Sequence, residues 1–272
     1  MTTSQAEPAN GLEWFGREIE AALIHKGATQ RELADFTGYK EPYVSKVKNG
    51  KALASPEFAR ACDRFFDTSG WFARLRVRIS ERGHPGWFVP YVNLERQAGL
   101  VEDYSNALIM GMFQTWEYAE ATFRATFPYE ADDQIKTRVE ARLARREVLE
   151  RGAEPLLWVI LHEATLRTMV GSRAVMADQL RQLAIDGGNP HVTVQVLRSQ
   201  TGAPASGSPF TLLTAGDGAT VLYTEAMGRG HVTDSAQSVN HGRTTFERLR
   251  ASARDPEESL ALIREIAEEY AR

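Results

Sequence analysis

QRELADFTGYKEPYVSKVKNG, residues 30–50, is the stretch that decides the fold of the N-terminal part of this chain. Thr29 precedes it and Glu32 follows three residues later, which is the spacing of a capping box and predicts the start of a helix. Gly38 suits the tight turn that would end such a helix. We therefore expect a short helix that runs to about Thr37.

A second short helix is expected from about Glu41 to Lys48, because the Asn49-Gly50 dipeptide that follows is a turn signal. At helical spacing Val44 and Val47 would point inward and pack on the preceding helix. Two short helices joined by a tight turn are the layout of a helix-turn-helix. The outer face of the second helix is then left to Glu41, Pro42, Ser45 and Lys46.

Further helices are expected on either side of this pair. Leu12 to Lys26 has apolar residues at helical spacing, and Ser55-Pro56-Glu57 places proline at a first helical position. Residues 11–70 are thus expected to form a mainly α bundle of four or five helices. Residues 1–10 are polar and lack the features of a signal peptide, so we expect a disordered tail there.

The C-terminal part, residues 91–272, mixes helix and strand patterns, and residues 71–90 are interpreted as a connecting segment with a helix at its start. The expected fold is an α+β domain with a sheet of four or five strands. Helices are expected over residues 94–126 with a break near Gly111, and over 131–151, 172–186, 235–253 and 256–270. Strands are expected over residues 156–161, 192–196, 210–214 and 220–224.

Composition limits the function classes. The chain has 272 residues, no run of about 18 apolar residues, and one cysteine, which cannot form an internal disulfide. We therefore expect a cytoplasmic protein with no membrane contact. Residues 1–80 hold 12 Lys/Arg and 10 Asp/Glu, a net of +2, whereas the whole chain holds 32 and 36 and the remainder is −6. Contacts to phosphates are thus expected in the N-terminal part.

Residue types around the short helices favour double-stranded DNA as a partner. Lys40, Lys46, Lys48 and Lys51 outnumber the acidic Glu41 there, and cations beside a groove can pair with phosphates. Gln30, at a helix start, could donate to a phosphate together with the backbone amides. The alternative is a generic helical bundle with a solvated lysine face.

Residues 12–66 resemble the Xre/lambda-repressor-type helix-turn-helix at Gln30, Leu33-Ala34, Gly38, Tyr43 to Val47 and Asn49-Gly50. Residues 71–272 resemble the C-terminal domain of WhiJ-like, antitoxin-like actinobacterial regulators. That second resemblance is carried by Pro85 to Phe88, Gly111 to Tyr118, Leu157 to Ala164, Ser208 to Leu213, Tyr223 to Glu225 and Pro256 to Leu260. The resemblance implies a sequence-specific transcriptional regulator, with a small partner protein encoded nearby.

Pattern and resemblance together give the expected DNA-binding residues: Gln30, Lys40, Glu41, Pro42, Tyr43, Ser45, Lys46, Lys48 and Asn49. Two positions depart from the family. Lys40 stands where Ser or Thr usually caps the second helix, and lysine has no side-chain oxygen with which to cap. Pro42 replaces a polar residue and can offer a base only apolar contact, such as to a thymine methyl group. Glu41 could accept from a cytosine amino group but would be repelled by phosphates.

Enzyme signatures are missing from the sequence. His162-Glu163 is not followed by the second histidine of a zinc motif, and Gly207-Ser208-Pro209 does not make a nucleophile elbow. We therefore expect no catalytic residues, no metal and no cofactor. Glu163 and Glu225 each follow a predicted strand, where they form either a polar site or solvated caps. An enzyme with an attached DNA-binding module stays a third hypothesis.

The role of the C-terminal domain is left open by the sequence. Regulators with one helix-turn-helix usually form dimers, so a homodimer is expected. The domain is then interpreted as binding the partner protein or, alternatively, as sensing a metabolite. Gln114 and Tyr118, beside the apolar Met110, Met112, Phe113 and Trp116, could line a pocket, and the loop 201–209 could cover it. Core packing of the apolar cluster and a flexible connector are the favoured interpretations. The arginines of residues 131–151 are balanced by acids, so that helix is expected to be solvated or to face a partner.

Overall fold

The structure is a computed structural model that describes residues 11–81, 84–149 and 155–272. The chain divides into two compact units, residues 1–82 and 83–272. The expected tail over residues 1–10 lies outside the described residues, as does the end of the helix expected over 131–151. Within the described ranges, no helix is both long and apolar enough to span a membrane.

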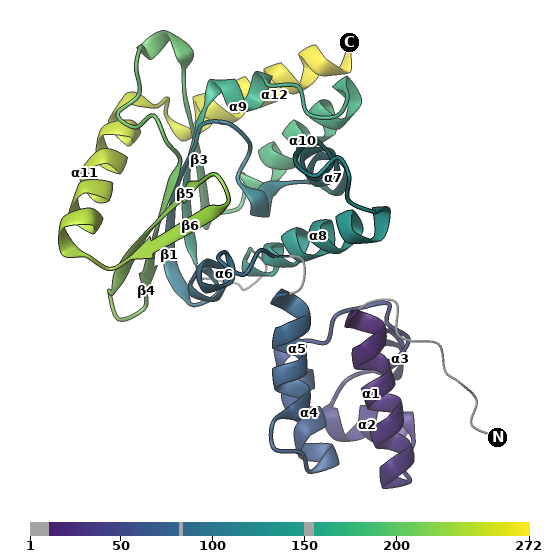
Figure 1. Cartoon of the computed structure of the whole chain (residues 1–272). Helices are drawn as coiled ribbons and strands as arrows, with labels where there is room; N and C mark the ends of the chain where they lie inside the picture. The colour runs from purple at the N-terminus through teal and green to yellow at the C-terminus, as the bar shows by residue number, and fades with distance from the viewer. Residues whose placement is uncertain (1–10, 82–83, 150–154) are drawn as a thin grey trace. The chain divides into compact units, whose positions relative to one another are not determined.

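The first unit is a bundle of helices around one apolar core (Figure 1). The local signals acted as predicted. Thr29 and Glu32 form the capping box, Gly38 is left-handed at φ 77°, and Ser55 caps the helix that begins at Pro56. The helices are α1 (Gly11–Lys26), α2 (Gln30–Thr37), α3 (Glu41–Lys48), α4 (Pro56–Phe66) and α5 (Trp71–Glu81).

Helix α5 corrects the expectation of a connecting segment over residues 71–90. Phe72, Leu75 and Ile79 are buried in the core of the first unit, so this helix is part of the bundle. The Asp63 carboxylate fixes its start, because it accepts hydrogen bonds from the backbone N–H groups of Phe72 and Ala73, both at 2.9 Å. A helix was expected at the start of this segment, but its apolar side was not assigned to the core of the bundle.

The second unit is built on a six-stranded mixed sheet with the order β3-β2-β1-β4-β5-β6. Strands β1, β2 and β3 are parallel, and β4, β5 and β6 continue the sheet from β1 in antiparallel pairs. The strands are β1 (Ala98–Ser105), β2 (Leu156–His162), β3 (Val192–Leu197), β4 (Phe210–Ala215), β5 (Thr220–Ala226) and β6 (Arg229–Thr233).

Two strands were not predicted, which is why the sheet exceeds the four or five strands expected. Residues 98–105 were expected to be helical, but they form β1, which pairs with β2 on one side and β4 on the other. Pairing on both sides overrides a local helical pattern. Residues 229–233 form the edge strand β6, whose exposed side chains give little hydrophobic alternation. The α+β class itself is confirmed.

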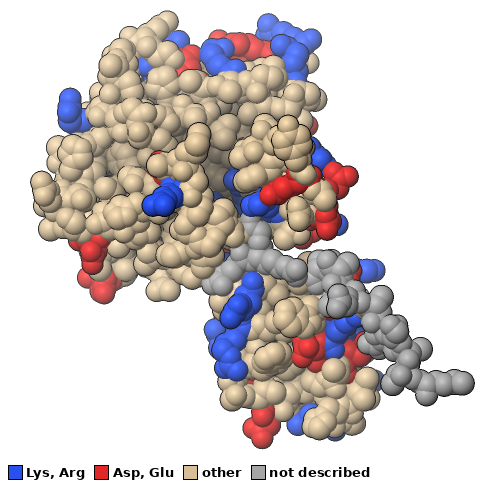
Figure 2. Space-filling model, viewed as in Figure 1, with Lys and Arg blue, Asp and Glu red and all other residues tan. Residues whose placement is uncertain are grey.

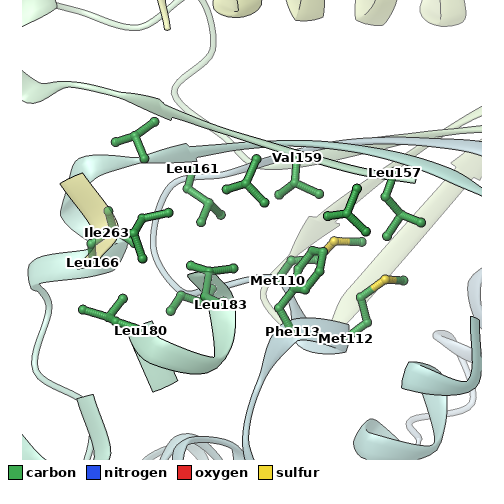
Figure 3. Packing of buried hydrophobic residues seen from close by; sticks show 14 of the residues in the cluster. Met110, Met112, Phe113, Leu157, Val159, Leu161, Leu166, Leu180, Leu183 and Ile263 are labelled. Atoms are coloured by element: carbon green, nitrogen blue, oxygen red, sulfur yellow. The ribbon is translucent and has the colours of Figure 1, made fainter. Parts of the chain in front are cut away.

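Helices cover both faces of this sheet (Figure 1). Leu157, Val159 and Leu161 alternate along β2 and point to one face, where they pack toward Leu180, Leu183 and Ile263 (Figure 3). Ile160, between them, points to the other face and packs with Phe246 of α11. The helices of the second unit are α6 (Val89–Glu95), α7 (Trp116–Thr126), α8 (Asp132–Ala144), α9 (Glu163–Arg167), α10 (Arg173–Asp186), α11 (Ala236–Ser252) and α12 (Pro256–Ala271), with short 3-10 turns η1 (Gly111–Phe113), η2 (Arg145–Val148) and η3 (Ser199–Thr201).

Candidate nucleic-acid interface

Helix α3 is fixed to the bundle along one side only. Val44 and Val47 are fully buried in the core that also holds Leu33 and Ala34 of α2. Burial of two valines stabilises this docking by roughly 3–6 kcal/mol, from about 1.5–3 kcal/mol for each fully buried aliphatic side chain. The opposite side is open, because Glu41, Pro42 and Lys46 are exposed and Ser45 is half-exposed.

The start of α3 is the most polar part of this surface. Lys40 occupies the N-cap position with extended backbone and makes no side-chain capping hydrogen bond, as its chemistry requires. Glu41 and Pro42 fill the first turn. Gln30 Nε2 donates to the backbone oxygen of Glu41 at 3.5 Å, a long contact that brings the starts of α2 and α3 together.

Tyr43, Lys48 and Asn49, which are also among the expected DNA-binding residues, have side-chain contacts within the first unit. Tyr43 stacks on Tyr39 with a centroid distance of 4.7 Å, and its hydroxyl oxygen accepts from the backbone N–H of Ser55 at 2.8 Å. Lys48 Nζ lies 3.7 Å from a carboxylate oxygen of Glu20 on α1. These contacts orient Tyr43 and Lys48 toward the bundle. Asn49 Nδ2 donates to Ser45 Oγ at 3.2 Å at the end of α3.

Charge distinguishes the open face of α3 only modestly. Lys40 and Lys46 are exposed beside Glu41, and within the described part of the chain Lys46 has no ion-pair partner. Blue and red atoms are interspersed over the face of the first unit that Figure 2 shows, rather than gathered into one basic area. The exposure of α3 along one side is therefore stronger evidence for its function than the charge of its surface.

The arginines of α8 and η2 are not solvated as expected. Arg145 is buried and makes a bidentate ion pair with the buried Glu95, at 2.8 and 2.7 Å. Arg142 is half-buried and lines a cavity of about 260 Å³. Sequence periodicity could not show this, because Glu95 is 50 positions away in the sequence.

The apolar residues near Gly111 divide between core and cavity. Met112 and Phe113 are fully buried core residues (Figure 3). Tyr118 is also buried, and its hydroxyl oxygen accepts from the backbone N–H of Ile109 at 3.4 Å. Gln114 is only 2% exposed and lines the same cavity as Arg142.

The two glutamates that follow strands have different surroundings. Glu163 accepts from Arg167, Arg198 and the backbone N–H of Ser199, and these hydrogen bonds lower the pKa of its carboxyl although burial alone would raise it. Glu225 lines the cavity and accepts from the Tyr223 hydroxyl at 2.8 Å. Among the described residues, no three His, Cys, Asp or Glu side chains are grouped so as to hold a metal ion.

Two family models match the chain. Residues 19–70 match a model described as "Helix-turn-helix", of the Xre type found in DNA-binding regulators, and this range contains α2, α3 and α4. Residues 88–265, well over half of the chain, match a model described as "Domain of unknown function (DUF5753)". No curated protein and no solved structure matches the chain.

Proposed function

Because the chain belongs to the DUF5753 family and carries the Xre-type helix-turn-helix of DNA-binding transcriptional regulators, we propose that it recognises specific duplex sequences with α3 in the major groove. The observation that carries this proposal is the one-sided anchoring of α3. Its buried valines fix the helix to α2, while its outer face is open along the first two turns. A groove-reading helix needs both properties.

We assign the expected DNA-binding residues to three roles. Lys40 and Lys46, which are exposed, pair with phosphates or with guanine. Gln30 donates to a phosphate of the DNA backbone. Tyr43, Lys48 and Asn49 position the helix, because their side chains already contact the bundle or the helix end. Base edges then meet Glu41, Pro42 and Ser45, which form the exposed front of α3.

The second unit supplies the other functions of a regulator in this proposal. A homodimer would place two copies of α3 on two half-sites, which is how single helix-turn-helix proteins reach useful affinity. The resemblance to WhiJ-like regulators supports a small partner protein encoded nearby and an antitoxin-like arrangement. The sheet and helices of residues 88–265 are where we place both contacts.

A second candidate role for this unit is metabolite sensing. A specific observation favours it: a cavity of about 260 Å³ is lined by Asp103, Arg142, Arg145 and Glu225, four charged side chains in one small space. Burying charge is expensive, and clustered charges in a cavity mark ligand sites more often than they mark structural cores.

The DNA-binding proposal is tested by mapping bound sites across the genome of the native host and then measuring affinity for a recovered site. We expect Lys46→Ala to weaken binding about tenfold or more, since a good base contact contributes about 1–3 kcal/mol. Lys136→Ala, an equal charge change at an exposed position of α8, is the control and should leave affinity unchanged. Unchanged affinity in Lys46→Ala, with the fold intact by circular dichroism, would remove Lys46 from the interface.

A further inference from the structure

The cavity of the second unit lies where the direction of the sheet changes. Strand β1 has the parallel β2 on one side and the antiparallel β4 on the other. After β1 the chain continues toward β2 on one side. On the other side, it reaches the start of β4 from β3 through the loop 201–209. Segments that diverge in this way open a crevice at the strand end, the usual place for ligands in such sheets. Asp103 and Ser105, at the end of β1, line the cavity here.

The cavity holds a cation, Arg142, that has no direct ion-pair partner among the described residues. Arg142 Nη1 donates to Gln114 Oε1 at 2.8 Å, and the guanidinium stacks 3.9 Å from the centroid of the Phe123 ring. Within the described part of the chain, no carboxylate lies within ion-pair distance of Arg142. Burial and the neighbouring Arg145 lower its pKa, yet an arginine stays protonated at neutral pH. A positive charge therefore faces the cavity.

The cavity also holds two carboxylates, Asp103 and Glu225, that make no direct ion pair with any described residue. Asp103 is buried and accepts hydrogen bonds from two hydroxyls, Ser105 Oγ at 2.6 Å and Thr211 Oγ1 at 2.8 Å. Glu225 accepts from the Tyr223 hydroxyl. Arg145 compensates Asp103 only in part, because its Nε and Nη2 are engaged by Glu95. Arg142 and these two carboxylates thus share one space without a direct ion pair among them, and Glu225 acts on Arg142 only at longer range.

Aromatic rings form a wall of the same cavity. Tyr91 and Tyr223 lie with ring centroids 4.2 Å apart, and Phe88 stacks on Tyr91 at 5.0 Å. Faces of such rings attract organic cations, and they pack well on flat apolar groups. The wall is fixed in place because Tyr91 donates to Glu95 at 2.7 Å. The Arg145 guanidinium already lies over the Phe88 and Tyr91 rings, 5.1 and 5.5 Å from their centroids, so a ligand's ammonium group would meet the carboxylates and its apolar part this wall.

We propose that this cavity binds a small zwitterion of the amino-acid class, with its carboxylate on Arg142 and its ammonium group on Asp103 and Glu225. The volume, about 260 Å³, corresponds to roughly nine liquid waters, which is room for a ligand of this class. A simple anion would leave the two carboxylates unbalanced, and a simple cation would leave Arg142 unbalanced. The inference rests on the metabolite-sensing role proposed above and is independent of DNA binding.

The test uses the full chain without DNA. Thermal unfolding is measured with each of the twenty amino acids, and calorimetry gives Kd for those that bind. At about a hundredfold excess over Kd we expect Tm to rise by at least about 5 °C. For each amino acid that binds, its decarboxylated amine and its deaminated acid should bind at least tenfold more weakly.

Matched variants connect binding to the cavity. Arg142→Gln and, at the exposed rim, Glu225→Gln should each raise Kd at least tenfold. Arg138→Gln on the same helix pairs with Glu130 outside the cavity and should leave Kd unchanged. The proposal is overturned if no amino acid stabilises the protein, if either analogue binds as well as its parent, or if both cavity variants bind normally.

A parallel panel of nucleotides and sugar phosphates distinguishes a wrong ligand class from a wrong sensing role. If one of these binds in an Arg142-dependent manner while the amino acids do not, the ligand class is wrong but the sensing role stands. If neither panel binds, the sensing role fails as well. Gel-shift assays on the same preparations report on DNA binding separately.

Discussion

Lys46 and Lys48 stand two positions apart on α3, yet their surroundings differ. Lys46 is exposed and, among described residues, has no ion-pair partner, whereas Lys48 is half-buried beside Glu20 of α1 at 3.7 Å. The sequence pattern treats both as basic residues of one helix. Only the helix rotation set by the buried Val44 and Val47 distinguishes the lysine that faces outward from the lysine that faces α1.

We therefore predict that Lys48→Ala weakens DNA binding by less than threefold, well below the effect of Lys46→Ala. The half-exposed pair with Glu20 is worth about 0.2–1 kcal/mol at most, so stability should also change little. Fluorescence anisotropy over a range of salt concentrations measures both effects. If Lys46 contacts a phosphate, its loss also lowers the salt slope by about 0.9. Equal losses in the two variants would contradict the roles assigned here.

Asp103 gives a prediction about pH. Burial raises the pKa of its carboxyl to about 6, against which the Ser105 and Thr211 hydroxyls act only in part. The folded chain then keeps a proton that the unfolded chain loses near pH 4, so folding stability falls as pH rises from about 4 to about 6. A shift of about two pKa units corresponds to roughly 3 kcal/mol.

Asp103→Asn should lack this dependence. Urea unfolding is measured at pH 4, 5, 6 and 7. The free energy of unfolding of the variant should rise relative to that of the natural chain up to about pH 6, with no further rise above that pH. Asp178→Asn, whose side chain is 71% exposed, serves as the control and should give no such trend. A constant difference between Asp103→Asn and the natural chain would show that the carboxyl titrates normally.

Among the elements, those with local signals could be predicted and those fixed by distant partners could not. The capping box at Thr29 and the glycine turn at Gly38 act within a few residues, and α2 and α3 form where expected. The β4–β5 hairpin likewise follows from its own turn. Strand β1 becomes a strand because β2 and β4 flank it, and no signal within residues 98–105 carries that information.

The same difference between local and distant signals explains which residues of the candidate sites could be predicted from the sequence. The exposed face of α3 follows from helix periodicity, so its residues could be named in advance. The cavity residues come from seven separate elements and the loops beside them, with Asp103 on β1 and Arg142 on α8. Gln114 and Glu225 could be singled out from the sequence as polar residues in unusual places, but not as neighbours of the two arginines.

Packing of α1 on α3 supplies a prediction for a whole element. A Cβ at Gly16 would lie 2.1 Å from the backbone oxygen of Lys48, so the two helices meet where α1 has no side chain. Gly16→Ala must push the end of α3 away, and such overpacking costs about 1–3 kcal/mol. We expect a lower Tm for the first unit by circular dichroism, together with weaker DNA binding.

Gly86→Ala, at a turn of the second unit where a Cβ meets no atom within 4 Å, is the control for a glycine-to-alanine change without overpacking and should leave the Tm of the first unit unchanged. Without the contact to α3, alanine in place of Gly16 would stabilise helix α1 by about 1 kcal/mol. A stable Gly16→Ala variant would therefore mean that α1 and α3 tolerate a wider separation than the structure shows.

At the scale of the molecule, each unit has a core of its own. The first unit buries Phe15, Phe58 and Phe72 in one cluster, and the second buries the faces of its sheet in others. This division agrees with the two family matches, which stop at residue 70 and resume at residue 88. We therefore expect each unit to hold its fold by itself, and functions to be separable along the same line.

The fragment of residues 1–82 tests that expectation, since it contains the whole first unit. We predict that it remains helical with a cooperative thermal transition, and that Lys46→Ala still weakens its binding to duplex DNA. Its affinity should be about a hundredfold below that of the full chain, because a lone unit contacts one half-site and loses the gain from linked binding. Full affinity in the fragment would place the dimer contacts in the first unit. A fragment that is unfolded would show that the α1–α5 core needs residues beyond 82, although its buried aromatic cluster argues for independence.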